Sequence, residues 1–399
     1  LAAFILNLGF SNISYSQLTE NVLIVIIDGA RYTETFGDAS HEYIPEMYDL
    51  SLQGAVVNNF NNDGTTYTSR AIPALWCGAW TEVRDTLYND GWTSYAVKPT
   101  IFEYLRKQKN IPADECYYVL KYIPNLWLPS FDADYGPDYW PAFHSVGDHD
   151  NDVAYQTEYV MDNFHPQFLW VYLADTDHAG HSGIWDDYIN AIANADQIVG
   201  NLWDKIHANP HYANKTTMIV TNDHGRHNAQ HGGFDGHGCS CEGCRHIQFL
   251  AIGPDVKSNY ISSQYRTIPD MAVTASYLLG VNPEKATGLI MHEILNVNAT
   301  NEQFSSFPVV KIGNIYPNPI LNNTNIKYQL NKSSDVTLGI YNYTGEEVRL
   351  LVNDFQLLGT HEIEWNCTNN EGLKLPVGFY SLVLKAGSTA INEKLIIIN

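Results

Sequence analysis

The chain has 399 residues, a length that allows two or three domains, each with a core of its own. Hydrophobic residues make up 45% and charged residues only 17%, which excludes a disordered chain and is typical of a globular protein. Acidic residues outnumber basic ones 44 to 22, and the net charge of −22 repels a phosphate backbone, so we expect no nucleic acid as a structural partner.

The N-terminal residues resemble a targeting segment. The apolar stretch Leu1 to Phe10 is followed by small and polar residues, as at the end of a secretory signal. This stretch is too short to span a bilayer, and no later segment reaches eighteen apolar residues. We therefore predict a partial signal peptide over 1–17, export through the periplasm to the cell surface or medium, and no transmembrane anchor.

Short apolar runs alternate with amphipathic stretches up to about residue 295. Four runs have the β-rich composition of strands that are covered on both faces: 22–27, 168–173, 218–221 and 247–252. Helical spacing occurs over 100–108 and 186–207. This alternation predicts an α/β domain over 18–295, in which helices sandwich a mostly parallel sheet.

The composition changes after Leu295. Residues 296–310 are mostly polar and aperiodic, which predicts a linker. Four later segments alternate apolar and polar residues: 324–330, 335–341, 361–365 and 378–384. We predict an Ig-like β-sandwich over 311–399.

Acidic residues and histidines follow three of the predicted strands: Asp28, Asp177 with His181, and Asp223 with His224. Ligands of open α/β sheets bind beyond the carboxyl ends of the strands, so these side chains are expected in one crevice. Aspartate and neutral histidine suit Zn²⁺, and the lack of cysteine at these positions favours an open catalytic site over a closed structural one.

The order of these motifs resembles the alkaline phosphatase superfamily, and most closely its nucleotide pyrophosphatase/phosphodiesterase branch. That family runs Asp, a Thr or Ser nucleophile, Asp-x-x-x-His, Asp-His and a last His. The resemblance implies a hydrolase that acts on small phosphate esters with two zinc ions. It divides the ligands into two groups: Asp28, Asp223, His224 and the nucleophile at one zinc, and Asp177, His181 and the last His at the other.

Three threonines in the segment 64–70 are candidates for the nucleophile: Thr65, Thr66 and Thr68. In the family, a glycine closes the helix ten positions after the nucleophile, and an asparagine that donates to the phosphoryl oxygen lies twenty-one positions after it. Counting from Thr68 reaches Gly78 and Asn89. We therefore predict Thr68 as the catalytic nucleophile and metal ligand, and Asn89 as the catalytic donor.

Thr66 fits a different pattern. With Arg70 it resembles the sulfatase motif Cys-x-Pro-Ser-Arg, and it stands where the modified cysteine would be. A threonine cannot become formylglycine, which argues against sulfatase chemistry. A sulfatase-like hydrolase is therefore kept as an alternative function.

The last histidine of the resemblance has four candidates: His227, His231, His237 and His246. The segment 237–247 most resembles the family segment before a strand that ends in Gly-Pro, so we predict His237 as the ligand and His231 as the second choice. The same segment contains three cysteines: Cys239, Cys241 and Cys244. Their spacing fits either a separate metal site or a local disulfide with one spare thiol.

Family monoesterases carry a Lys-x-Arg motif that grips the terminal phosphate. Lys121 stands near that place, but isoleucine replaces the arginine. Lys121 is therefore predicted to bind substrate, while the choice between monoester and diester stays open. The acidic stretch 148–152 is interpreted as a solvated loop.

The C-terminal segment resembles the type IX secretion sorting domain of Bacteroidota over 311–399. The motifs are Ile315-Tyr-Pro-Asn-Pro319, the segment 340–348, and Gly378-Phe-Tyr380 with 394–397. This resemblance implies the type IX secretion machinery as a partner. Another possible function is a surface or adhesion protein that binds metal without turnover, but the complete ligand set with Thr68 and Asn89 favours an enzyme.

Overall fold

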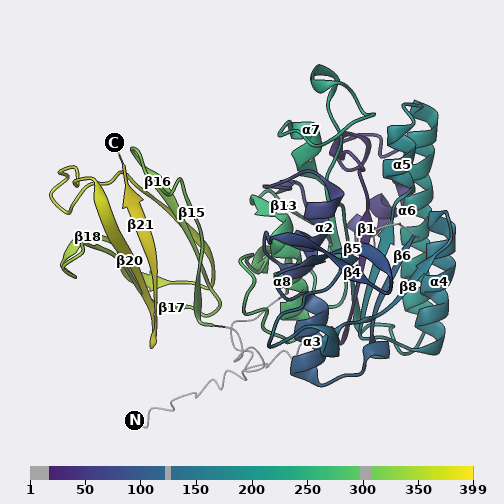
Figure 1. Ribbon diagram of the computed structural model, residues 1–399, viewed down its shortest axis with the longest axis horizontal. Helices are drawn as coiled ribbons and strands as arrows, with labels where there is room; N and C mark the ends of the chain where they lie inside the picture. Colours follow the sequence, from purple (N-terminus) through teal and green to yellow (C-terminus); the bar gives the residue numbers. More distant parts are fainter. Residues whose placement is uncertain (1–17, 122–126, 297–307, 399) are drawn as a thin grey trace, which may run out of the picture.

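The computed structural model describes residues 18–121, 127–296 and 308–398. The predicted signal peptide and residues 297–307 of the predicted linker therefore lie outside the described residues. The described chain forms an α/β domain and a C-terminal β-sandwich (Figure 1). In these ranges, no helix is both long and apolar enough to cross a membrane.

The α/β domain is built on one eight-stranded sheet. Its strands stand in the spatial order β13 (Tyr260–Ser262), β2 (Ala55–Val57), β12 (Phe249–Ile252), β10 (Thr216–Thr221), β1 (Asn21–Ile27), β9 (Phe168–Leu173), β6 (Cys116–Lys121) and β8 (Ala142–Val146). Only β12 runs antiparallel to its neighbours β10 and β2; the other five pairs are parallel. The mostly parallel sheet is thus confirmed.

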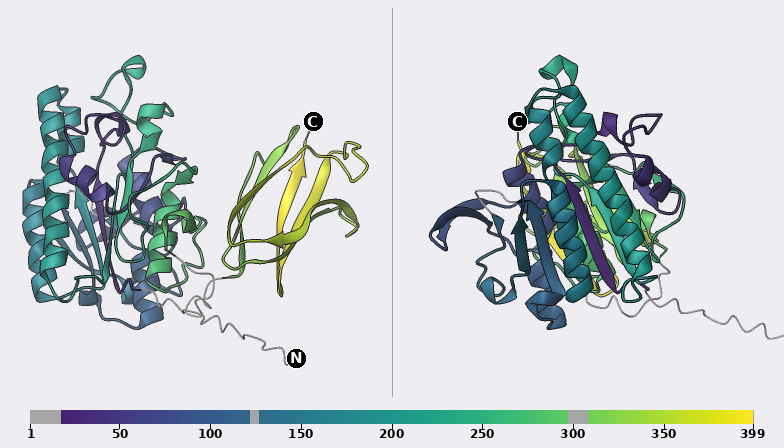
Figure 2. Two further views of the ribbon diagram at one scale, coloured as in Figure 1. Left: turned by 180° about the vertical axis from the view of Figure 1, so that it is seen from behind. Right: turned by 90° about the vertical axis from the view of Figure 1, so that its right-hand side faces the viewer.

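Helices cover both faces of this sheet (Figures 1 and 2). One layer contains α1 (Pro45–Ser51), α4 (Asp150–Asn163) and α6 (Trp185–Ala208), and the other contains α2 (Thr68–Cys77), α3 (Ile101–Lys109) and α8 (Ile268–Leu278). In β1, the side chains of Leu23, Val25 and Ile27 pack in the core with α1, α4 and α6. The residues that alternate with them pack in the core on the other face, with α2, α3 and α8. Each buried aliphatic side chain contributes about 1.5–3 kcal/mol, so this burial fixes β1 at the centre of the domain.

Smaller elements complete the domain. Two further sheets contain β3 (Phe60–Asn61), β11 (His246–Ile247) and β14 (Arg266–Thr267), and β4 (Val83–Tyr88), β5 (Gly91–Ala96) and β7 (Trp127–Leu128). Two short helices are α5 (Asp175–His181) and α7 (Glu242–Arg245), and single 3-10 turns span Tyr32–Glu34, Ala113–Glu115, Pro137–Tyr139, Ala229–His231 and His292–Ile294.

The prediction of one strand over 247–252 is wrong, because the structure has two short strands there. Gln248 separates β11 from β12, and the two strands belong to different sheets. The backbone of Gln248 bonds to side chains instead: its N–H donates to Asn222 Oδ1 (3.0 Å), and its carbonyl accepts from Thr221 Oγ1 (2.7 Å). The chain therefore changes sheets at this residue without leaving its polar backbone groups unpaired.

The C-terminal domain is the predicted β-sandwich. One antiparallel sheet contains β15 (Val310–Tyr316), β16 (Thr324–Leu330) and β19 (Gly359–Trp365), and the other contains β18 (Glu347–Gln356), β17 (Ser334–Tyr341), β20 (Gly378–Ala386) and β21 (Thr389–Ile397). Trp365 and Tyr328 are buried among aliphatic residues from both sheets. Burial of these large side chains gives the small domain a core of its own.

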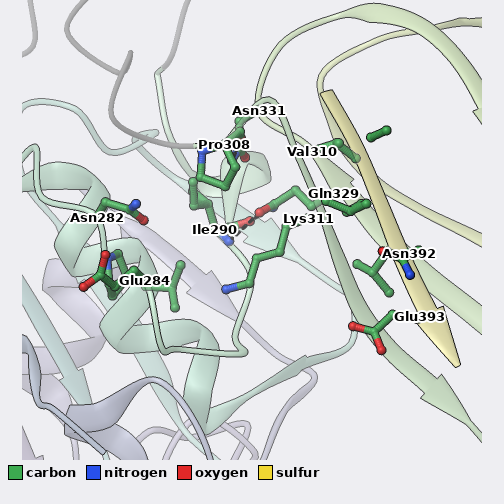
Figure 3. A pocket seen from close by; sticks show the side chains of 15 residues that line it. Asn282, Glu284, Ile290, Pro308, Val310, Lys311, Gln329, Asn331, Asn392 and Glu393 are labelled. Atoms are coloured by element: carbon green, nitrogen blue, oxygen red, sulfur yellow. Dashed lines mark hydrogen bonds between the residues drawn. The ribbon is translucent and has the colours of Figure 1, made fainter. Parts of the chain in front are cut away.

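The two domains meet at defined polar contacts (Figure 3). Lys311 Nζ donates to the carbonyls of Ala286 (2.8 Å) and Gly288 (2.9 Å), and the Gln329 amide exchanges hydrogen bonds with the backbone of Ile290. A cavity of about 670 Å³ lies beside these contacts. Burial in this interface lowers the pKa of Lys311 to about 8.

The interface also contains a histidine that should make stability depend on pH. His292 is buried, its Nε2 lies 3.3 Å from Asn331 Oδ1 of the sandwich, and its Nδ1 has no hydrogen-bond partner. Burial lowers its pKa to about 4; Arg266 lowers it further, whereas the hydrogen bond with Asn331 and the charge of Glu293 act to raise it.

Because the unfolded chain binds this proton near pH 6.5, the stabilisation by neutral His292 is complete above that pH and is lost as the pH falls toward 4. We expect a difference of up to about 3 kcal/mol in the free energy of unfolding. Denaturant titrations of wild type and His292→Gln at pH 7.5 and 4.5 measure it. Glutamine keeps an amide donor for Asn331, so the variant should lose less stability on acidification. Equal losses in the two proteins would contradict this role.

Candidate metal centre

The strands β1, β9 and β10 end at one edge of the sheet. Ile27 lies in register with Leu173, and Ile26 with Thr221. The chain therefore leaves all three strands at the same level, as expected for a ligand crevice. The predicted residues lie directly beyond these ends: Asp28 after β1, Asp177 and His181 on α5, and Asp223 and His224 after β10.

The direction of β12 brings a further loop to the same edge. Because β12 runs opposite to β10, its first residue Phe249 pairs with Thr221 at the carboxyl end of β10. The loop that leads toward β12 thus passes the crevice, and His237 stands on this loop.

Asp28, Asp223 and His224 form a first cluster, in which one ligand atom of each lies within 4.8 Å of the others. His224 Nε2 is 3.5 Å from Asp28 Oδ1 and 3.4 Å from Asp223 Oδ2. All three side chains are buried, and those two carboxylate oxygens have no hydrogen-bond partner. Buried hydrogen-bond acceptors that lack a donor are energetically costly, so this set of ligand atoms fits a bound cation.

The electrostatics of this cluster lead to the same conclusion. Burial, followed by the charges of Asp223 and Asp177, raises the pKa of Asp28 well above its usual range. Burial and the Asp177 charge likewise raise the pKa of Asp223. Two buried carboxylates repel each other, and a divalent cation between them removes that repulsion.

Asp177, His181 and His237 form a second cluster beside the first. His181 Nε2 is 3.3 Å from Asp177 Oδ2, His237 Nε2 is 3.6 Å from Asp177 Oδ1, and the two Nε2 atoms are 3.1 Å apart. The ring of His237 also stacks on that of His224 at 4.0 Å, so the two clusters adjoin. His231 lies elsewhere, exposed and bonded to Asn228.

The pKa values of Asp177 and His237 in the second cluster both lie below their usual values. Burial acts to raise the pKa of Asp177, but the hydrogen bond from His181 and the charges of His224 and Arg226 hold it below its usual value. Burial, followed by the charge of His224, lowers the pKa of His237 to about 4. At neutral pH this cluster is therefore a carboxylate with a neutral His237, which is the form that binds a metal.

Thr68 is the threonine that faces the first cluster. Its Oγ1 lies 3.0 Å from His224 Nε2 and 3.4 Å from Asp28 Oδ2. Thr68 begins α2, and Gly78 closes that helix in a left-handed conformation (φ 62°), as the family spacing predicts. Thr66 is buried and its Oγ1 donates to the carbonyl of Cys239 (2.9 Å), away from the carboxylates.

Two side chains that the sequence analysis missed hold the ligands in place. The hydroxyl of Tyr172 donates a short hydrogen bond to Asp28 Oδ2. The fully buried Arg226 donates to Asp177 Oδ1 and to backbone carbonyls of the loop that carries His237. A charged residue directly after Asp-His-Gly was the available signal for Arg226; nothing distinguishes Tyr172 from the other apolar residues of β9.

Gly29 follows Asp28 at the point where these groups crowd together. A Cβ atom on Gly29 would lie 2.8 Å from Asp177 Oδ1 and 3.0 Å from Arg226 Nη1, and φ is +71°. A side chain at this position would displace Asp177 or Arg226, so glycine is required by both space and conformation.

Lys121 and the acidic stretch 148–152 form a separate polar group next to α5. Lys121 Nζ is 2.6 Å from Asp175 Oδ1 and 2.9 Å from His178 Nδ1, in a buried ion pair. Asp150 accepts from the N–H groups of Ala174 and Asp175 and is fully buried. Four of the five residues of this stretch are exposed, as predicted. The interpretation as a solvated loop is wrong for Asp150, which begins α4 and fixes the start of α5. Contact between Lys121 and substrate stays a prediction.

Asn89 lies apart from the two clusters. It is exposed at the turn between β4 and β5, with φ 49°, and the structure gives it no hydrogen bond to Thr68 or to the ligands described above. Its catalytic role stays a prediction.

Comparisons with known proteins agree with this arrangement. The family model "Type I phosphodiesterase / nucleotide pyrophosphatase" matches residues 47–237, and the model "FlgD Ig-like domain" matches 321–390. No curated protein matches the chain closely enough to count as a relative. The β-sandwich is therefore confirmed as Ig-like, and the phosphodiesterase match spans most of the residues that form the clusters.

Solved structures share the fold at low identity. Murine ectonucleotide pyrophosphatase/phosphodiesterase 5 is 15% identical (TM-score 0.51; 69% of this chain, all of that chain). A mutant of the alkaline phosphatase PafA is 11% identical (TM-score 0.50; 70% and 100%), and a candidate sulfatase from Bacteroides fragilis is 14% identical (TM-score 0.52; 90% and 91%). The α/β domain has an alkaline phosphatase-like fold. At the carboxyl edge of its sheet, this domain presents the two ligand clusters that the sequence resemblance implies.

Proposed function

We propose that the alkaline phosphatase-like domain hydrolyses phosphoric diesters or pyrophosphates by nucleophilic attack of Thr68, at a site that holds two zinc ions. The observation that carries the proposal is the place of Thr68 Oγ1, within 3.4 Å of both Asp28 and His224 and next to the second cluster. A solved structure of murine phosphodiesterase 5 contains an inactive threonine-to-alanine variant in complex with AMP, which supports a threonine in this role.

The ligand assignment follows the two clusters. Asp28, Asp223, His224 and Thr68 would hold one ion, and Asp177, His181 and His237 the other. The unpartnered oxygens of Asp28 and Asp223 support this fit. Bound Zn²⁺ supplies Lewis-acid stabilisation of the oxygen atoms that enter and leave phosphorus.

Residues of the chain supply the nucleophile and orient the metal ligands. Thr68 is half-buried at the first turn of α2, so its hydroxyl reaches substrate while the helix N-terminus favours the phosphoryl anion. The Thr68 hydroxyl loses its proton, Oγ1 forms a bond to phosphorus, and the bond to the leaving oxygen breaks, so that the leaving alcohol takes up a proton. Water then attacks phosphorus and breaks its bond to Oγ1, which releases the phosphomonoester and returns a proton to Thr68. Tyr172 and Arg226 orient Asp28 and Asp177 throughout.

The diester preference is supported by the surroundings of Lys121. Its ammonium group is neutralised by Asp175, and isoleucine stands where a monoesterase has arginine. A terminal phosphate dianion would therefore lack the pair of cations that monoesterases offer.

A substrate screen tests this proposal. Purified protein is assayed with p-nitrophenyl phosphate, bis-p-nitrophenyl phosphate, a p-nitrophenyl nucleotide ester and p-nitrophenyl sulfate, with zinc and with a chelator. We expect the diester or the nucleotide ester to be hydrolysed fastest and zinc to be required. Faster turnover of the sulfate would favour the sulfatase-like alternative, which the bond from Thr66 Oγ1 to the Cys239 carbonyl, away from the carboxylates, argues against. No turnover of any ester would favour metal binding without catalysis.

Asn89 is proposed to donate to a non-bridging oxygen during the reaction. Asn89→Gly is a sharp test, because glycine accepts the positive φ of the turn and removes only the amide. We expect kcat to fall by roughly 10²–10³, as for other single donors to a developing charge. An unchanged kcat would mean that asparagine serves only the turn.

We also propose export through the type IX machinery, directed by the segment 1–17 and the domain 311–399. Deletion of 311–399 should leave an active domain in the periplasm of a Bacteroidota host. The carbonyls that now accept from Lys311 would be exposed to water, which can replace that donor. Appearance of the truncated protein in the medium would contradict the sorting role.

A further inference from the structure

The loop between β10 and β11 contains a third group of ligand side chains, distinct from the two catalytic clusters. One ring nitrogen of His227 and the Sγ atoms of Cys239 and Cys244 all lie within 4.8 Å of one another. Cys239 and Cys244 share the loop with His237, but their thiols meet His227 instead of the carboxylates.

The distance between the sulfur atoms distinguishes a metal site from a disulfide. Cys239 Sγ and Cys244 Sγ are 3.7 Å apart, and all six cysteines of the chain are free. A disulfide brings its sulfur atoms to about 2.05 Å. Two thiolates on one tetrahedral zinc, with Zn–S bonds of about 2.3 Å, stand about 3.8 Å apart. The observed separation excludes a disulfide and matches that of two ligands of one metal.

The histidine of this group is arranged as a ligand. His227 Nε2 is buried and has no hydrogen-bond partner. Such a nitrogen is costly in a protein interior unless something satisfies it. A metal held by the neighbouring thiolates would accept its lone pair.

Cys241 is the residue available as a fourth ligand, because it lies between the other two cysteines in the chain. Its backbone N–H donates to Cys239 Sγ (3.2 Å), a contact that stabilises a thiolate and holds Cys241 beside that sulfur.

We propose that His227, Cys239, Cys241 and Cys244 bind one zinc ion in a closed, structural site. Three thiolates and one imidazole form a common ligand set of structural zinc, and the site has no open position for substrate. This ion would be a third metal, in addition to the two of the catalytic centre.

The site would fix the geometry of the catalytic loop. The Cys239 carbonyl accepts from Thr66 Oγ1 (2.9 Å), and the Thr66 carbonyl lies 3.0 Å from His237 Nδ1. The backbone N–H of His227 donates to the carbonyl of Gly236 (2.7 Å). A metal at the cysteines would therefore hold both the segment that leads to Thr68 and the loop that carries His237. This positioning role rests on the proposed function, whereas the metal site itself does not.

Cobalt substitution of the full-length protein tests the site. Cobalt bound by thiolates gives intense near-ultraviolet charge-transfer bands, which carboxylate and imidazole ligands cannot produce. We expect these bands in the wild type, together with three equivalents of zinc by elemental analysis before substitution. Cys244→Ser and His227→Ala should lose the bands or shift them and bind one zinc fewer. Cys367→Ser, which changes a buried cysteine of the sandwich, is the matched control and should keep both.

Three outcomes are distinct. If the bands persist in the variant Asp223→Asn, the cysteine site is independent of the catalytic centre, and a failure of the proposed chemistry would leave it standing. Wild-type protein without thiolate bands, and with an intact mass that is two hydrogens short, would show a disulfide and overturn the proposal. Wild-type protein with free thiols but no bands would overturn it equally, whatever the folding of the variants.

Discussion

Replacement of Thr68 by alanine should abolish nearly all turnover while zinc content stays unchanged. The change removes the hydroxyl that lies within reach of both Asp28 and His224, and it leaves the six carboxylate and imidazole ligands in place. By comparison with other enzymes that lose their nucleophile, we expect kcat to fall by about 10⁴ or more. Steady-state assays with the preferred ester, paired with elemental analysis, measure both quantities.

Thr66→Ala is the control for this prediction. Thr66 stands in the same segment and loses only its bond to the Cys239 carbonyl, so its effect should be about tenfold or less. If Thr66→Ala were the inactive variant and Thr68→Ala retained activity, the sulfatase-like alignment of Thr66 with Arg70 would have to be adopted.

Asp223→Asn should have the second largest effect, with opposite consequences for the metal-loaded and metal-free protein. With zinc present, the loss of a charged ligand should remove about one equivalent of metal and lower kcat by roughly 10³ or more. Without zinc, the same change removes a buried charge that repels Asp28, so the metal-free variant should be more stable than metal-free wild type.

Thermal unfolding of wild type and Asp223→Asn at pH 8, with zinc and with a chelator, measures these two effects on stability. Asp196→Asn is the matched control, because Asp196 is also buried but accepts from the backbone N–H groups of Glu46 and Met47. It should lower the melting temperature in both conditions and leave zinc content unchanged. A metal-free Asp223→Asn protein that is less stable than the wild type would contradict the repulsion on which the metal assignment depends.

The sequence allowed the centre of the fold to be predicted because its strands are buried on both faces. A continuous apolar run such as β1 identifies a central strand without knowledge of its partners. The residues after such strands must meet at one edge, and Asp28, Asp177 and Asp223 do so.

Residues that act through tertiary contacts were not predictable in this way. Asp150 looks like part of a solvated acidic stretch until β9 and α5 supply N–H groups for it. Arg226 resembles a surface arginine until the loop around His237 closes over it. The strand β18 likewise forms because it pairs with β17 at the edge of the sheet, and its half-exposed residues show no clear alternation that would predict a strand.

The most direct test of the central claim is to trap the covalent intermediate. Protein is mixed with the preferred ester, quenched in acid within milliseconds and digested, and the phosphorylated peptide is sequenced by tandem mass spectrometry. We expect a phosphoryl group on Thr68 that still carries the second ester group of the diester, in the peptide that begins α2, and no such group in the Thr68→Ala protein. The same group on Thr66 instead, or rapid turnover with no modified peptide at any quench time, would contradict the role of Thr68.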